Sequence, residues 1–352
     1  MTVNSEKSLK RKYARIAAID IGTVTTRLLV VDVFVQEGAK ISMKEIYRDM
    51  RITHLGQGVN DRAQLSGEGM RAVLQVLNEY VQLLEHFQVD DVLCVATSAV
   101  RDAENAEQFI AAAAKIDVDI EVIPGQIEAR LAFMGATYDE GDGGSVCVKS
   151  TAAMMKATTA IADGATLVVD IGGGSTELVL GCVGGASNAE ILKLSSLQVG
   201  ARRLTDMFLD SDPPRGVEIK GARKYLEMFC GFDLKKYVGE FDRLVAVAGT
   251  ATTLAAVLGK IDPYNPREIQ GYRVSRADLD GLLQLFLSKK LEQRQKICGL
   301  EPKRAGVIVA GTLIMEAIMD ALDCEEFFAS DRDLLYGIIL SATKSALTRC
   351  QL

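Results

Sequence analysis

The sequence predicts an α/β protein of two related domains that face each other across a cleft, and three observations carry this prediction. A chain of 352 residues exceeds what one compact core usually holds, so about two domains are expected. A strand–turn–strand pattern occurs twice, and the copies are 150 positions apart because Asp20 of the first matches Asp170 of the second. Elsewhere, short apolar runs alternate with helical patterns, as at residues 91–96 and 105–115.

The second copy, residues 167–180, has the densest run of groups suited to a phosphate. Three consecutive glycines in its turn let backbone N–H groups close around an anion. Ser175 and Thr176 add hydroxyl donors, while Asp170 and Glu177 supply oxygens suited to a hard cation. The pattern indicates a turn that binds a metal-bound phosphate, and its glycines are Gly172, Gly173 and Gly174.

The first copy, residues 16–33, has the same leading aspartate and glycine, followed by threonines. One such aspartate alone would be a weak signal. Two copies of the turn predict two elements that bind one ligand from opposite sides of a cleft, a common place for a binding site. The polar residues assigned to this first turn are Asp20, Gly22, Thr23 and Thr25.

Between the copies, the apolar run 91–96 predicts a buried strand that leads into Thr97, Ser98 and Arg101. Ligands of α/β folds sit at the carboxyl ends of strands, so Arg101 is expected to contact phosphate. An amphipathic pattern at 66–87 predicts a purely structural helix.

The helix expected at 126–134 has Glu128 in its first turn, where free N–H groups favour an ionised carboxylate. Taken alone, Glu128 is most simply an acid at a helix start with no other task. Residues 139–164, rich in Gly, Ala, Thr and Met, predict a surface excursion.

After the second copy, a strand at 191–199 and a glycine precede Arg202 and Arg203, which suits an anion site. A strand, small-residue turn and helix start at 244–254 bring Gly249 and Thr250 to a helix N-terminus that could hold phosphate or nucleotide. The run 307–313 predicts a second such module, in which Gly311 could simply permit close helix packing.

Near the end of the chain, Lys289, Lys290, Arg294 and Lys296 predict a solvated basic face. The last helix, 333–347, is expected to pack back on the N-terminal half.

Composition narrows the class of protein. The formal net charge of −7 argues against a broad nucleic-acid surface. No window is long and apolar enough for a membrane span, and the polar, basic start lacks a signal-peptide core, so a cytoplasmic protein without membrane contact is expected. Two histidines disfavour a histidine triad or a multi-histidine metal site, and seven cysteines without C-x-x-C spacing favour reduced thiols.

Together these segments resemble the exopolyphosphatase/guanosine pentaphosphate phosphohydrolase family of the actin-like ATPase superfamily, in its short two-domain form. The resemblance implies two actin-like (ribonuclease H-like) domains with mixed sheets flanked by helices, which we place at 1–124 plus 331–352 and at 125–330. The segments that carry it, in the family's order, are 18–23, 96–103, 125–131, 167–180, 200–205 and 247–250.

The resemblance implies a Mg²⁺-dependent hydrolase, with Mn²⁺ as a substitute, that removes a terminal phosphate from polyphosphate or guanosine pentaphosphate. Glu128 would orient and deprotonate the attacking water. Asp170 and Glu177, with Asp20, would hold the metal, and Arg101 and Arg203 would neutralise phosphoryl charge. Positioning, metal and electrostatics do most of the work in phosphoryl transfer, so no protein nucleophile is required.

Two other interpretations stay open. An actin-like kinase or ATPase would use the same cleft for ATP, although Glu128 and Arg101 favour the hydrolase. A sensor that binds polyphosphate or a guanosine alarmone without turnover is kept open by Val24 and Ile127, where the family commonly has Asn and an acid. A homodimer is a further expectation that the sequence does not decide.

Overall fold

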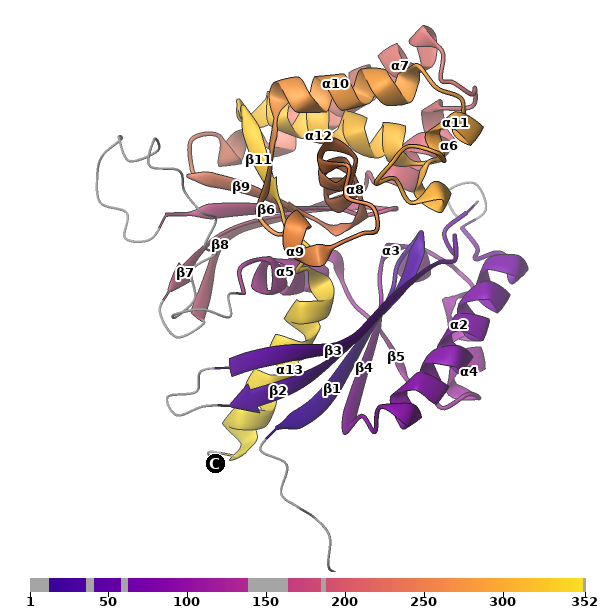
Figure 1. The fold of residues 1–352 in the computed structure, drawn as a ribbon, viewed down its shortest axis with the longest axis vertical. Coiled ribbons are helices and arrows are strands. Elements are labelled where there is room, and N and C mark those ends of the chain that lie inside the picture. Colours follow the sequence, from indigo (N-terminus) through magenta and orange to yellow (C-terminus); the bar gives the residue numbers. More distant parts are fainter. Residues whose placement is uncertain (1–12, 36–40, 58–62, 139–163, 185–187, 351–352) are drawn as a thin grey trace, which may run out of the picture.

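The computed structural model describes residues 13–35, 41–57, 63–138, 164–184 and 188–350. The predicted surface excursion at 139–164 lies almost wholly outside the described residues. Two mixed β-sheets with helices around them form the molecule, and Figure 1 shows the first sheet below the second. The predicted α/β class is therefore confirmed. No helix of the described ranges is both long enough and apolar enough to span a membrane.

The first sheet has the strand order β3-β2-β1-β4-β5. Strands β1, β2 and β3 pair antiparallel, whereas β4 and β5 join parallel to β1 and to each other. The five strands are β1 (Ala14–Ile21), β2 (Thr25–Val35), β3 (Ile41–Ile52), β4 (Asp91–Ala96) and β5 (Ile120–Val122).

The second sheet has the order β10-β11-β9-β6-β7-β8, with an antiparallel β6–β7 hairpin and β9 parallel to β6. Its register repeats that of the first sheet: Asp20 faces Arg27 across β1 and β2, and Asp170 faces Glu177 across β6 and β7. The strands are β6 (Thr166–Ile171), β7 (Thr176–Gly184), β8 (Asn188–Leu197), β9 (Arg243–Val247), β10 (Tyr272–Ser275) and β11 (Glu326–Ala329).

Helices cover both faces of the first sheet. On one face, α2 (Gly67–His86) and α4 (Ala106–Ala114) bury an apolar stripe, and the short α3 (Ser98–Arg101) follows β4. Ser66 caps α2 by accepting a hydrogen bond from the Gly69 N–H at 3.0 Å. On the other face lies α13 (Leu334–Cys350), which packs on β1 as predicted for the last helix.

The second sheet is covered on one face by a large apolar core and on the other by α5 (Gly125–Ala136). The sheet's remaining α-helices are α6 (Ala201–Phe208), α7 (Gly216–Asp233), α8 (Ala248–Gly259), α9 (Pro266–Ile269), α10 (Arg276–Leu287), α11 (Leu291–Arg294) and α12 (Ile308–Leu322).

Helices α5 and α13 cross between the sheets, and two glycines permit the close contact. A Cβ on Gly135 would overlap the Asp333 carbonyl, and a Cβ on Gly337 would overlap the Leu131 carbonyl. The crossing places the end of α5, at Gly135, against the start of α13, at Asp333. The division of the chain at 124/125 and 330/331 stays a prediction.

Two sequence predictions are wrong. Residues 307–313 contain no strand, because their apolar side chains are buried all round α12. Gly311 nevertheless permits close packing, since a Cβ there would lie 2.7 Å from the Thr250 hydroxyl oxygen of α8. Arg294 is not solvated but buried, with an ion pair to Asp212 at 3.0 Å.

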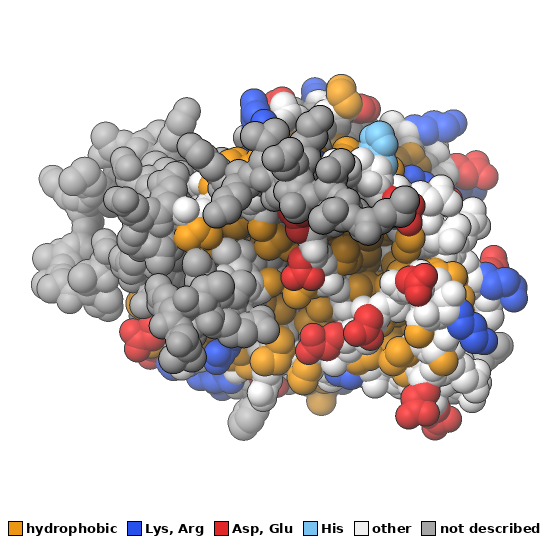
Figure 2. Space-filling model, turned by 90° about the horizontal axis from the view of Figure 1, so that it is seen from below, with side chains coloured by type: hydrophobic (Ala, Val, Ile, Leu, Met, Phe, Trp, Pro, Cys, Tyr) orange, Lys and Arg blue, Asp and Glu red, His pale blue; other side chains and the backbone are white. Residues whose placement is uncertain are grey.

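Basic side chains do not gather into one patch on the face shown in Figure 2. Acidic and hydrophobic side chains are interspersed there, and the basic ones lie mostly toward the margins.

Candidate active site

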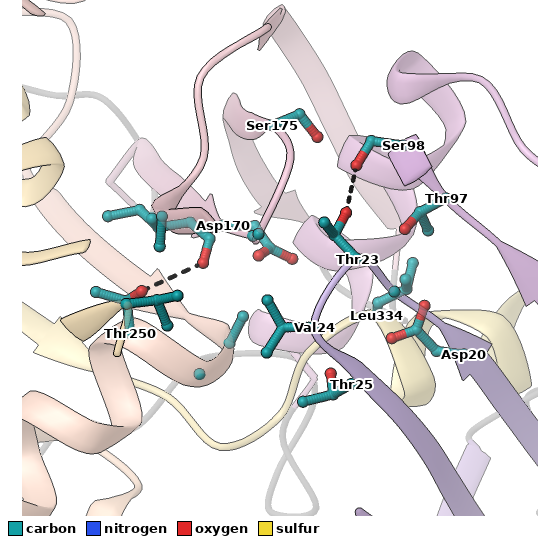
Figure 3. A pocket seen from close by; sticks show the side chains of 18 of the residues that line it. Asp20, Thr23, Val24, Thr25, Thr97, Ser98, Asp170, Ser175, Thr250 and Leu334 are labelled. Carbon is teal, nitrogen blue, oxygen red and sulfur yellow. Dashed lines mark hydrogen bonds between the residues drawn. The ribbon is translucent and has the colours of Figure 1, made fainter. Parts of the chain in front are cut away.

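The two duplicated turns meet between the sheets and enclose a cleft of about 90 Å³. Figure 3 shows Asp20 and Thr23 of the first turn on one side of this cleft, with Asp170 and Thr250 opposite. The sequence-predicted residues that line it are Asp20, Gly22, Thr23, Thr25, Glu128, Asp170, Gly172, Gly173, Ser175, Gly249 and Thr250.

Glycines of the second turn are needed for this close approach. A Cβ on Gly173 would lie 2.8 Å from both the Thr23 Cβ and the Val24 Cγ2, and one on Gly174 would overlap the Ser98 hydroxyl. Thr23 Oγ1 and Ser98 Oγ are themselves 2.9 Å apart and hydrogen-bonded. Because Gly173 and Gly174 have no side chains, the two turns can approach each other this closely.

Carbonyl groups of the same turn cap α6. The N–H of Ala201 donates to Gly172 O at 2.9 Å, and those of Arg202 and Arg203 donate to Gly173 O at 2.8 and 3.0 Å. The first N–H groups of α6 are therefore already satisfied, and this helix start holds the turn in place.

The start of α8 faces the cleft in a strained conformation. Ala248 has φ of 61°, which a residue with a Cβ rarely adopts. Gly249, the next residue, leaves room for Arg304, because a Cβ there would overlap the guanidinium. Arg304 lines the cleft, and burial lowers its pKa. Arg304 could not be assigned from the sequence, since nothing in its local pattern separates it from a surface arginine.

Arg27 is a second cation that the sequence analysis did not assign. Its Nε and Nη2 contact Asp20 Oδ2 at 2.8 and 2.7 Å, and its Nη1 contacts Asp333 at the start of α13. These partners raise the pKa of Arg27 despite its burial. The register of the hairpin is the one signal that could have paired Arg27 with Asp20.

Glu128 reaches the cleft from the first turn of α5 and pairs with Arg101. Arg101 Nη1 donates to Glu128 Oε2 at 3.1 Å and to the carbonyl of Ile123 at 2.9 Å. Burial raises the pKa of Glu128 to about 7, against the lowering effect of Arg101. The carboxylate can therefore exchange a proton near neutral pH.

Asp170 and Glu177 lie side by side on the β6–β7 hairpin. Burial, reinforced by Asp333 and Glu128, raises the pKa of Asp170 to about 8. Burial also raises the pKa of Glu177 well above its ordinary value, although Ser196 donates to its Oε1 at 2.8 Å. Buried carboxylates that lie this close together favour the binding of a proton or a cation.

Five predicted residues do not line this cleft. Arg101 and Glu177 stand behind it, in contact with Glu128 and Ser196. Gly174 and Arg203 line a small adjoining pocket, where Arg203 pairs with Asp102 at 2.6 Å. The hydroxyl of Thr176 is turned away, because it donates to the Val199 carbonyl at 2.6 Å.

The acidic residues fit a divalent cation that arrives with phosphate. Asp20 Oδ1 and Glu177 Oε2 are buried without a hydrogen-bond partner, which is costly for a carboxylate oxygen unless a cation approaches it. Within the described part of the chain, no three acidic, His or Cys side chains already form a metal-binding cluster. Mg²⁺ commonly takes only one or two carboxylates and completes its shell with water and substrate phosphates.

A chamber of about 640 Å³ adjoins the cleft, and Arg27, Ala248, Gly249 and Arg304 line both cavities. Its wall combines apolar side chains with five acids and four bases. The acids are Asp49, Asp262, Glu301, Asp331 and Asp333, and the bases are Arg27, Arg48, Lys296 and Arg304.

Comparisons with known proteins agree with this geometry. The model of the Ppx/GppA phosphatase family matches residues 33–148 and 149–346. Exopolyphosphatase 2 of Mycobacterium tuberculosis is 33% identical over 341 residues, which cover 93% of this chain and 98% of that protein.

Solved structures agree as well. The crystal structure of the Aquifex aeolicus member of the Ppx/GppA protein family has a TM-score of 0.72 at 30% identity and covers 95% of this chain and 99% of that one. An exopolyphosphatase from Cytophaga hutchinsonii has a TM-score of 0.77 at 26% identity, with coverages of 94% and 98%.

A cleft built from two duplicated phosphate turns, with a buried carboxylate and arginines around it, defines a phosphoanhydride hydrolase of the actin-like fold. The chain belongs to the Ppx/GppA phosphatase family.

Proposed function

We propose that this protein is a Mg²⁺-dependent exopolyphosphatase that releases terminal orthophosphate from inorganic polyphosphate. The observation that carries the proposal is the position of Glu128, which is buried beside Arg101 and lines the cleft together with both duplicated turns. The Mycobacterium tuberculosis relative named exopolyphosphatase 2 supports the same substrate.

In this proposal, Glu128 is the general base that deprotonates the attacking water. A carboxylate with a pKa of about 7 is well matched to accept a proton near neutral pH. Arg101 holds this carboxylate in position and neutralises charge that develops on the phosphoryl group.

The backbone of the two turns, Ser175 and the start of α8 hold phosphate oxygens, and Arg27 and Arg304 supply positive charge. The residues that would hold Mg²⁺, or Mn²⁺ in its place, are Asp20, Asp170 and Glu177. The bound cation would offset negative charge on the phosphate oxygens.

Guanosine pentaphosphate is the second candidate substrate, and the chamber beside the cleft favours it. Tyr264, Ile297 and Leu300 give this chamber apolar surface, which suits a nucleoside whose phosphates enter the cleft past Arg304. ATP hydrolysis or phosphoryl transfer, and binding without turnover, are the remaining alternatives. Of the two residues that keep the sensor open, Val24 lines the cleft, whereas Ile127 is 43% exposed.

The test compares phosphate release from short polyphosphate, long polyphosphate, guanosine pentaphosphate and ATP, with Mg²⁺ and with EDTA. We expect release from polyphosphate with Mg²⁺ only, and loss of turnover in Glu128→Gln with the fold retained. Glu121→Gln, an exposed glutamate of β5, is the matched control. Release from ATP alone would support the ATPase, and tight binding without release would support the sensor.

The proposal also includes three expectations from the sequence alone. The protein is cytoplasmic, it forms a homodimer, and it has no nucleic-acid or membrane partner.

A further inference from the structure

Arg27 is the cation most tightly bound by acids at the cleft. It lies on β2 where the cleft and the chamber adjoin, and it lines both. Asp20 contacts it from the cleft side at 2.7 Å, and Asp333 contacts it from the chamber side. All three side chains are at most 14% exposed. One guanidinium therefore faces two buried carboxylates.

The cleft has little positive charge to spare for a polyanion. Among its described lining residues, three acids (Asp20, Glu128 and Asp170) face two bases (Arg27 and Arg304). Asp333 stands outside this lining, yet it contacts the one base that is already paired with Asp20. Asp333 therefore reaches the cleft only through Arg27, whose positive charge it offsets.

We propose that Asp333 is a specificity-determining residue that weakens binding of free polyphosphate by neutralising Arg27. It sets how strongly the cleft binds a polyanion that brings no cation with it. The proposal rests on polyphosphate being the ligand of the cleft, as proposed above.

Asp333 also has a structural task, which the test must leave intact. Its Oδ1 accepts the Leu335 N–H at 3.1 Å and so caps α13. Asn and Ser are equally good caps, so Asp333→Asn and Asp333→Ser remove the charge and keep the cap acceptor. Two neutral variants guard against a folding defect in either one.

The experiment measures the Kd of inorganic tripolyphosphate by calorimetry in EDTA, where no cation accompanies the probe. We expect Asp333→Asn to bind about tenfold more tightly than the parent, the size expected for one unit charge a few ångström from the bound anion. The salt dependence of Kd should become steeper, a change that a purely structural role of Asp333 would not produce.

Asp32→Asn is the matched control. Asp32 is also a buried partner of an arginine, Arg15 at 2.6 Å, but it lies five positions further along β2 from Arg27, roughly 17 Å away. Its removal changes the net charge equally and should leave Kd within about twofold, because screening weakens charges at that distance.

The proposal is overturned if both folded Asp333 variants bind tripolyphosphate no more tightly than the parent. It is also overturned if Asp32→Asn gains as much affinity, or if neither parent nor variant binds. A parent that binds tripolyphosphate but releases no phosphate with Mg²⁺ would instead refute the proposed hydrolase and leave the role of Asp333 standing.

Discussion

Arg101 Nη1 donates to Glu128 Oε2 across 3.1 Å and joins the end of α3 to the start of α5. The two residues are 27 positions apart, and they meet because the parallel strands β4 and β5 end side by side and are followed by α3 and α5. The contact ties the proposed base to a positive charge, and its removal has a definite consequence for pH dependence.

We predict that Arg101→Gln shifts the acid limb of the pH–kcat profile to higher pH. Arg101 stabilises the ionised form of Glu128, so its loss raises the pKa of Glu128 further above about 7. A base must be unprotonated, so activity should fall at pH 7 and partly recover near pH 9. Arg130→Gln, an exposed arginine of α5, is the control. An acid limb at the same pH in Arg101→Gln and the parent would show that Arg101 does not set the pKa of the general base.

Burial of the cleft carboxylates predicts an unusual pH dependence of stability. The pKa of Asp170 is about 8 and that of Glu128 about 7, whereas unfolded carboxyls titrate near about 4. Between these values the folded protein binds more protons than the unfolded chain. Its stability therefore falls as pH rises through the window from about 4 to about 8.

The variant Asp170→Asn removes a carboxyl whose pKa is raised by burial to about 8. We expect its melting temperature in EDTA at pH 8 to exceed that of the parent by several degrees, with a flatter dependence on pH. Asp119→Asn, at an exposed aspartate, should melt like the parent at each pH. Equal slopes for Asp170→Asn and the parent would show that Asp170 does not titrate in this range.

The glycine turn gives a steric prediction. In Gly174→Ala the new methyl group overlaps the Ser98 hydroxyl, which we expect to cost about 1–3 kcal/mol of stability and to open the cleft. Ser98→Ala in the same chain should restore part of this loss, because it removes the overlapping oxygen. Denaturant unfolding of both single variants and the double variant measures the coupling. If the stability losses of Gly174→Ala and Ser98→Ala simply add in the double variant, the predicted overlap between these two residues is contradicted.

Local pattern revealed much of this site because each turn places its polar residues within a few positions of one another. Asp20, Gly22 and Thr23 are found at the cleft together with Asp170, Gly172 and Ser175. Apart from residues 307–313, the predicted strands and helices are found for the same reason, since periodicity and caps are local.

Contacts between distant residues could not be read in this way. Asp333 meets Arg27 across 306 positions, because only the packing of α13 on the first sheet brings them together. Arg294 looked like part of a solvated basic run, yet it is buried against Asp212, 82 positions away. The run 307–313 shows a further limit: short apolar segments look alike in a strand and in a fully buried helix.

The crossing of α5 and α13 links stability to the proposed chemistry. Gly337 lies against the carbonyl of Leu131, one helical turn beyond Glu128, so Gly337→Ala should push α5 away from α13. We expect a loss of about 1–3 kcal/mol and a lower kcat with little change in KM, because Glu128 is displaced while the phosphate turns stay in place. Gly281→Ala in α10, where a Cβ meets open space, should be neutral or slightly stabilising. A Gly337→Ala enzyme with normal kcat would show that the helix crossing does not position Glu128.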